Sequence, residues 1–150
     1  MIKKLEEIRK KIRNKKKVEE IVVLGGDDDF NRKVLEIKGV DVLLSPEKGH
    51  ERDSLKQRDS GLNHVLCKLA AKNNIIIGID FKNLKLKEIE LGKWLGRVMQ
   101  NIRLCRKFRV KMKIFNSKMT KQELRSFLLS LGMSTQQVKE TISYSKPIET

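Results

Sequence analysis

The chain has 150 residues, enough to bury a hydrophobic core, and we expect residues 1–150 to form a single domain. Lys and Arg number 34 against 19 Asp and Glu, a formal net charge of +15 that predicts an anionic partner, either nucleic acid or a membrane surface. No apolar run could span a bilayer and the charged amino terminus has no secretory signal, so we expect a cytoplasmic protein without a membrane segment.

Residues 1–17 combine many basic side chains with apolar residues at helical spacing, which predicts an amphipathic helix. A short β-branched strand is expected over 20–24. The acidic triplet 27–29 then suits the start of a helix that ends near Gly39, with a metal site as the alternative use of the triplet. A second strand over 40–45 precedes a charged segment, 47–60, which we expect to be a long loop.

The second half of the chain continues the alternation of strands and helices. We expect a helix, a buried strand, the longest helix, a half-exposed strand and two short helices over residues 60–74, 75–79, 85–108, 110–115, 120–131 and 135–144. Ser60 is the expected amino-terminal cap of the first of these helices, and Thr120 with Glu123 has the spacing of a capping box. Cys67 and Cys105 lie among apolar neighbours, which predicts buried thiols rather than a disulfide.

Four strands that alternate with helices predict an α/β fold with parallel strand pairing and right-handed crossovers. Four parallel strands leave two open edges and an inner face rich in Val, Ile and Leu. We therefore expect two copies of the chain, or one copy and a partner subunit, to cover that face.

Side chains suited to catalysis are scarce. His50 and His64 are the only histidines and neither has metal-ligand spacing, so we predict no catalytic, metal-binding or cofactor-binding residue. His64 suits either a packing role or a contact with RNA or a partner. Asp80, expected at the carboxyl end of a strand, is the one candidate carboxylate for a metal-dependent phosphoesterase. Gly25 and Gly26 precede three Asp residues, which disfavours phosphate binding there.

Basic side chains dominate two segments and are the predicted RNA-binding residues. The first group lies in the long loop after the second strand: Lys48, Arg52, Lys56 and Arg58. The second follows the longest helix into the next strand: Arg97, Arg103, Arg106, Lys107, Arg109 and Lys111. Because aromatic residues make up only 5% of the chain, we expect contacts to phosphate, sugar and shape rather than base stacking.

Several motifs resemble one known family. They are Ser45-Pro46, Arg58-Asp59-Ser60-Gly61, Asn63-His64, Gly78-Ile79-Asp80, the segment LGKWLGRVMQNIRLCRKFRVKMKIFNS and the ending ELRSFLLSLGMSTQQVKETIS. In this order they resemble the protein component 3 family of archaeal ribonuclease P, over roughly residues 18–148.

The resemblance implies a barrel related to the polymerase-and-histidinol-phosphatase hydrolases but without their metal-binding histidines. Family members carry several more amino-terminal β-α units, so it implies here a shortened, half-barrel version with about four strands. It also implies a non-catalytic subunit that binds ribonuclease P RNA and a small ferredoxin-like protein subunit, meets precursor tRNA indirectly, and supports removal of the 5′ leader while the RNA performs the chemistry. The alternatives are a shortened metal-dependent phosphoesterase and a general RNA-binding module.

Overall fold

The computed structural model of the chain describes residues 1–16, 19–49 and 59–146. Its centre is one sheet of four parallel strands in the order of the sequence: β1 (Val22–Leu24), β2 (Val42–Leu44), β3 (Ile76–Asp80) and β4 (Met112–Phe115). Each strand therefore pairs with the next one in the chain, as in a β/α barrel that has not closed. The predicted α/β fold with parallel pairing is confirmed.

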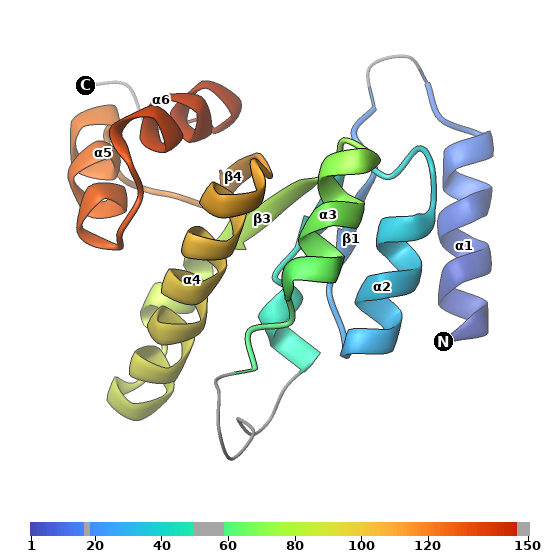
Figure 1. The fold of residues 1–150 in the computed structure, drawn as a ribbon, viewed down its shortest axis with the longest axis horizontal. Helices are drawn as coiled ribbons and strands as arrows, with labels where there is room; N and C mark the ends of the chain where they lie inside the picture. Colours follow the sequence, from blue (N-terminus) through green and yellow to red (C-terminus); the bar gives the residue numbers. More distant parts are fainter. Residues whose placement is uncertain (17–18, 50–58, 147–150) are drawn as a thin grey trace.

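Six helices accompany the sheet: α1 (Ile2–Arg13), α2 (Asp28–Glu36), α3 (His64–Lys72), α4 (Glu88–Phe108), α5 (Lys121–Ser130) and α6 (Thr135–Tyr144). Two 3₁₀ turns, η1 (Pro46–Gly49) and η2 (Phe81–Lys85), follow β2 and β3. Helices α1 to α4 stand side by side in front of the sheet, and α5 and α6 lie beyond β4 (Figure 1).

The core lies between the sheet and its helices. Leu43 of β2 and Ile77 of β3 are buried against side chains of the covering helices, among them Leu35 and Ile102. These strand residues alternate with ones that point to the other face of the sheet, as pleating requires. On that other face Val42, Leu44 and Phe115 converge so closely over Gly78 that a Cβ there would lie about 3 Å from each.

Most predicted elements are present, but some begin or end elsewhere. Asp27 caps α2 by accepting a hydrogen bond from the Phe30 N–H, and the predicted capping box at the start of α5 is formed. The expected cap at Ser60 was wrong. Helix α3 begins at His64, and the Asn63 side chain caps it by accepting from the Leu66 N–H at 2.9 Å. Both Ser and Asn are good caps, so local preference alone did not separate them.

The two edges of the sheet differ, contrary to the expectation of two open edges. At β4, the outward N–H of Ile114 donates to the Ser145 Oγ, which is buried at the end of α6, at 2.9 Å. At β1, Val22 and Leu24 remain 37% and 51% exposed, and among the described residues no strand lies beyond them. Among the described residues, therefore, only the β1 edge is left open.

Candidate nucleic-acid interface

The loops at the carboxyl ends of the strands are fixed by Asn31, a fully buried side chain of α2. Its Oδ1 accepts from the Gly26 N–H at 2.8 Å, and its Nδ2 donates to the carbonyls of Pro46 and Gly61 at 3.0 and 3.3 Å. Gly61 has a φ of +81°, and a Cβ there would lie 1.9 Å from the Pro46 carbonyl oxygen. One amide thus joins three loops whose backbones touch, which explains the glycines of the RDSG and GG motifs by packing.

The turn η1 is anchored to α4 by a buried carboxylate. Glu47 Oε1 accepts from Trp94 Nε1 at 3.0 Å. Burial raises the pKa of Glu47 above its ordinary value, although its hydrogen bonds and the charges of Lys48 and Arg97 oppose this. Lys48, the next residue, is exposed and remains available to an anionic partner.

Arg97, one of the predicted RNA-binding residues, is buried rather than displayed at the surface. Arg97 is only 8% exposed, because it lies on the same side of α4 as the buried residues Trp94, Val98 and Asn101. Its charge acts on Glu47 inside the protein. Sequence periodicity contained the signal for this, since positions 94, 97, 98 and 101 follow the helical repeat of a buried stripe.

A surface hollow of about 500 Å³ lies between the start of α3 and the second half of α4. Leu62, Leu104 and Phe108 form apolar parts of its lining, and His64 and Lys107 are exposed polar residues of it. The segment before α3 is held there by Asn101, whose Nδ2 donates to the Ser60 carbonyl at 2.9 Å. His64 is therefore at the surface rather than in the packing role that was one of its two predicted uses.

Three of the predicted RNA-binding residues form a basic cluster on the outer side of α4. Arg103, Arg106 and Lys107 are all exposed and fall within about 100° of arc at 3.6 residues per turn. Arg106 also donates from Nη1 to the Gly132 carbonyl at 2.9 Å, which ties α4 to the turn between α5 and α6. Arg103 and Lys107 carry no such tie to another helix, so they can meet phosphates at little structural cost.

The last two predicted residues of this group lie at the end of α4 and in the chain leading to β4. Arg109 is exposed and ends α4 in the left-handed conformation, with a φ of +58°. The Lys111 Nζ stands 5.6 Å from the centre of the Tyr144 ring on α6. Both are placed at the amino ends of the strands, away from Lys48 at the carboxyl ends. Arg52, Lys56 and Arg58 lie outside the described residues.

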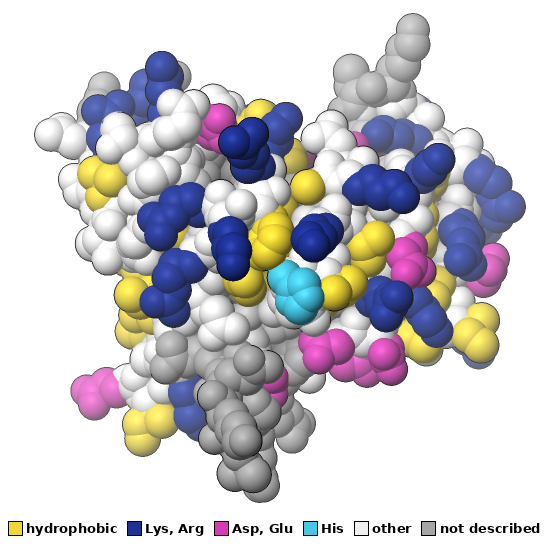
Figure 2. All heavy atoms as spheres, in the orientation of Figure 1, with side chains coloured by type: hydrophobic (Ala, Val, Ile, Leu, Met, Phe, Trp, Pro, Cys, Tyr) yellow, Lys and Arg dark blue, Asp and Glu magenta, His cyan; other side chains and the backbone are white. Residues whose placement is uncertain are grey.

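Sequence reasoning missed the contribution of α3. Lys68 and Lys72 are exposed, lie one helical turn apart, and belong to the helix that packs beside α4. Figure 2 shows Lys and Arg side chains distributed over the whole helical face of the molecule, with carboxylates fewer and more localised. The pattern Leu66, Cys67, Ala70 of buried residues predicts this outward side of α3, so the signal was present.

Asp80, the candidate phosphoesterase carboxylate, has structural partners. Its Oδ1 accepts from the Lys82 N–H at 2.9 Å and from Asn116 Nδ2 at 3.0 Å, which caps η2 and joins the ends of β3 and β4. Within the described ranges, no three His, Cys, Asp or Glu side chains are grouped closely enough to hold a metal ion. In the same part of the chain no helix is long and apolar enough to cross a membrane.

The thiols Cys67 and Cys105 are both buried and free, as predicted. They face each other across α3 and α4, and their mutual hydrogen bond together with burial raises the pKa of the Cys105 thiol well above its ordinary value.

No protein-family model matches the chain. Curated relatives do, and each carries the name ribonuclease P protein component 3. The protein from Methanococcus maripaludis is 37% identical over 105 residues, which cover 69% of this chain and 41% of the relative. The one from Methanocaldococcus jannaschii is 33% identical over 125 residues, 83% of this chain and 50% of the relative. The chain thus spans about half the length of the curated relatives it matches.

A solved structure shows that the similarity extends to the fold. A chain in the cryo-EM structure of archaeal ribonuclease P with mature tRNA superimposes with a TM-score of 0.75 at 30% sequence identity. The superposition covers 95% of this chain and 60% of that one. The similarity therefore extends over the helices and strands that carry the basic surface.

Proposed function

This chain belongs to the ribonuclease P protein component 3 family, and from that membership we propose that it is a protein subunit of a cytoplasmic ribonuclease P. In this role it binds the backbone of the catalytic RNA and supports removal of the 5′ leader from precursor tRNA, while the RNA performs the chemistry. The observation that carries the proposal is the match to a chain of archaeal ribonuclease P over 95% of the residues.

The basic cluster of α4, defined by Arg103, Arg106 and Lys107, supports RNA binding by this chain itself. Its side chains are exposed, and exposed Lys68 and Lys72 on α3 extend the positive surface. Duplex RNA displays phosphates at regular intervals and is recognised mainly by shape and backbone, a mode that needs cations rather than aromatic platforms. A protein with net charge +15 and 5% aromatic residues suits this mode.

The partner subunit belongs to the same proposal. We propose that a small ferredoxin-like protein subunit of the particle binds this chain, with a second copy of the chain as the alternative. Light scattering of the purified chain at micromolar concentration, alone and with that subunit, distinguishes the two. A dimer in the absence of the subunit supports the second copy.

Sequencing the RNA that copurifies with the protein from its own cells tests the function directly. We expect one abundant, structured RNA species, because a ribonuclease P subunit is bound to a single RNA. A mixed population of RNAs would instead support the general RNA-binding module. If no RNA were enriched, neither the ribonuclease P role nor the general RNA-binding role would be supported.

The surface is tested separately by two double variants that each remove two positive charges. Arg103→Ala with Lys107→Ala removes cations from the basic cluster, and Lys121→Ala with Arg125→Ala removes two exposed ones from α5. Using the copurified RNA as transcript, we expect the first to flatten the log–log salt dependence of binding by about 1 to 2 and the second to leave it nearly unchanged. Equal effects of the two variants would assign binding to net charge rather than to this cluster.

The phosphoesterase alternative depends on Asp80. A phosphatase activity abolished by Asp80→Ala, with the helix content retained, is the result that would favour it. The structural partners of Asp80 at 2.9 and 3.0 Å favour a packing role instead.

A further inference from the structure

The hollow between α3 and α4 has an apolar wall at the surface of the protein. Leu104 and Phe108 lie one turn apart on α4 and are partly buried, and Leu62, just before α3, is 6% exposed. The segment that contains Leu62 is fixed to α4, because Asn101 donates to the Ser60 carbonyl at 2.9 Å. The hollow is thus part of the packed structure, and its volume of about 500 Å³ is ordinary for a small-molecule site.

The charged residues of this hollow lie at opposite ends of it. Asp28, in the first turn of α2, and Asp59 line the end near the carboxyl ends of the strands. Next to Asp59, the Ser60 hydroxyl accepts from Gln100 Nε2 of α4 at 3.3 Å. Lys107 follows Gln100 by seven residues, which is about 10 Å along the helix axis. The hollow therefore has an acidic end and a basic end.

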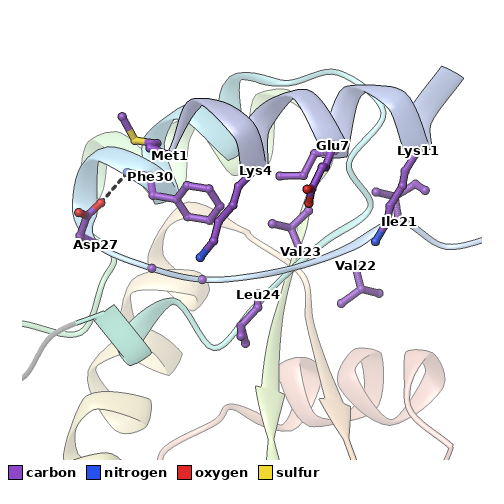
Figure 3. Close-up of a pocket in the computed structure, with 13 residues that line it drawn as sticks. Met1, Lys4, Glu7, Lys11, Ile21, Val22, Val23, Leu24, Asp27 and Phe30 are labelled. Carbon is purple, nitrogen blue, oxygen red and sulfur yellow. Dashed lines mark hydrogen bonds between the residues drawn. The ribbon is translucent and has the colours of Figure 1, made fainter.

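A second hollow, between α1 and β1, does not separate its charges in this way. Figure 3 shows Lys4, Glu7 and Lys11 following one another along α1, above the strand, with Asp27 at the start of α2. Because positive and negative side chains are interspersed there, that lining favours neither an anionic nor a cationic ligand.

The basic end of the hollow between α3 and α4 continues into the basic cluster of α4. Lys107 belongs to both, and its Nζ stands 5.5 Å from the centre of the Phe108 ring. A phosphate bound by Lys107 is therefore close to the apolar wall. Proteins hold unpaired RNA bases by stacking them on aromatic or histidine side chains, and this lining contains both Phe108 and exposed His64.

We propose that this hollow binds one unpaired nucleotide of the RNA, with its phosphate at Lys107 and its base against Leu104 and Phe108. The proposal rests on the proposed function, because it takes the ligand from the RNA that the basic cluster binds. The scarcity of aromatic residues excludes an extended stacking platform, but a single base needs only a single ring.

The acidic end of the hollow determines the orientation of the nucleotide. Carboxylates repel a phosphate and accept hydrogen bonds from the amino group of a base. The base therefore points from Lys107 toward Asp28 and Asp59, and a base with an amino group suits the site.

The test compares short RNA duplexes that differ by one base. One duplex carries a single unpaired adenosine, which has an amino group. A second carries an abasic nucleotide at the same place, which keeps the phosphate and the bulged backbone but removes the base. A fully paired duplex is the reference. Fluorescence anisotropy with the whole 150-residue chain measures the affinity for each duplex at one salt concentration.

We expect the adenosine bulge to bind about fivefold or more tightly than the abasic bulge, as for one stacked base. Phe108→Leu should abolish this preference and leave the affinity for the paired duplex unchanged, because it removes a ring and no charge. Phe108→Tyr is the matched control, since it keeps the ring and should keep the preference. Circular dichroism checks the fold. If Phe108→Leu unfolds, His64→Ala, at an exposed position of the same lining, replaces it and should reduce the preference.

Two outcomes overturn this proposal and leave the proposed function standing. One is equal binding of the adenosine and abasic bulges by the wild type. The other is a preference for adenosine that the lining variant fully retains, which would place the base elsewhere on the protein. If the chain binds none of the three duplexes, the proposal also fails, and sequencing of the copurified RNA decides separately whether the proposed function fails with it.

Discussion

Both edge strands of the sheet have outward backbone N–H and C=O groups that need hydrogen-bond partners, and the two edges differ in whether the chain supplies them. At β4, the buried hydroxyl of Ser145 accepts from the Ile114 N–H, and helix α6 covers the strand. At β1, Val22 and Leu24 line a groove, and the preceding residue Ile21 is held by its N–H, which donates to the Asp41 carboxylate at 2.7 Å. Lys15 donates to Asp41 at 2.8 Å on this side. Lys113 of β4 reaches Glu20, which precedes β1, at 2.9 Å, so this ion pair joins the β4 strand to the segment before β1.

The two edges therefore differ in how firmly each is closed by the rest of the chain. A neutral hydrogen bond inside the protein does not respond to salt and contributes to stability only as part of the packed fold. Exposed ion pairs are weak and are screened by salt, so they contribute little to closing a strand edge. The β4 edge is thus covered by α6, whereas Val22 and Leu24 at the β1 edge remain exposed among the described residues.

Leucine truncation should show the largest contrast between interior and open edge. Leu43 in β2 is 0% exposed and Leu24 in β1 is 51% exposed. We expect Leu43→Ala to lower the free energy of unfolding by about 2–5 kcal/mol and Leu24→Ala by about 0.5 kcal/mol, because only the first leaves a cavity. Urea denaturation measures both, and similar losses would mean that Leu24 is buried in solution by an unseen partner or copy.

The next largest effect on stability concerns the hydrogen bond between Ile114 and Ser145 that closes the β4 edge. Ser145→Ala leaves the Ile114 N–H buried without an acceptor, and we expect a loss of about 1–3 kcal/mol in the free energy of unfolding. Ser143→Ala is the matched control, since the Ser143 hydroxyl is exposed and bonds only within its own helix. A loss below that of the control would show that another group can accept from Ile114.

The smallest effect distinguishes the β1 side by its pH dependence. Burial raises the pKa of Asp41, but the hydrogen bond from the Ile21 N–H and the nearby Lys15 outweigh it, so the pKa lies below its ordinary 3.8. The folded state therefore binds this proton less readily than the unfolded state, and Asp41 stabilises the protein above pH 3.8. That contribution is lost as the pH falls through the folded-state pKa.

The contribution of Asp41 to the free energy of unfolding is measured by comparing urea denaturation of the wild type and of Asp41→Asn from pH 3 to pH 7. We expect the wild type to be more stable by less than about 1 kcal/mol at neutral pH, because Asp41 is partly exposed and solvent screens its ion pair, and we expect the difference to shrink on acidification. The Ser145→Ala difference should stay constant over the same range. If the difference in stability between the wild type and Asp41→Asn did not change with pH, the charge of the Asp41 carboxylate would not contribute to stability.

Much of the fold could be predicted because it depends on local pattern. The β-branched run before Gly25, the caps at Asp27 and Thr120 and the period of α4 each indicate one kind of element without knowledge of the rest. The site was predicted less well. Arg97 was grouped with the other basic residues of α4 by type, although its helical position beside Trp94 and Val98 already indicated that it faces inward.

The polar anchors were missed for a related reason. Asn31, Asn101 and Ser145 carry no periodic signal, because each is a single side chain whose partner lies far away in the chain. Their roles arise only when two segments meet and leave a backbone group without a partner. Exposed Lys68 and Lys72, in contrast, follow from the buried pattern of α3 and could have been identified.

The sequence by itself determined the alternation of strands and helices, the parallel sheet and the strong positive charge, because short-range periodicity and composition set these properties. Only the tertiary structure decided which loops Asn31 joins and which sheet edge Ser145 closes. Burial and hydrogen-bond satisfaction depend on neighbours distant in the chain, so they are defined only when the helices and the sheet have packed together.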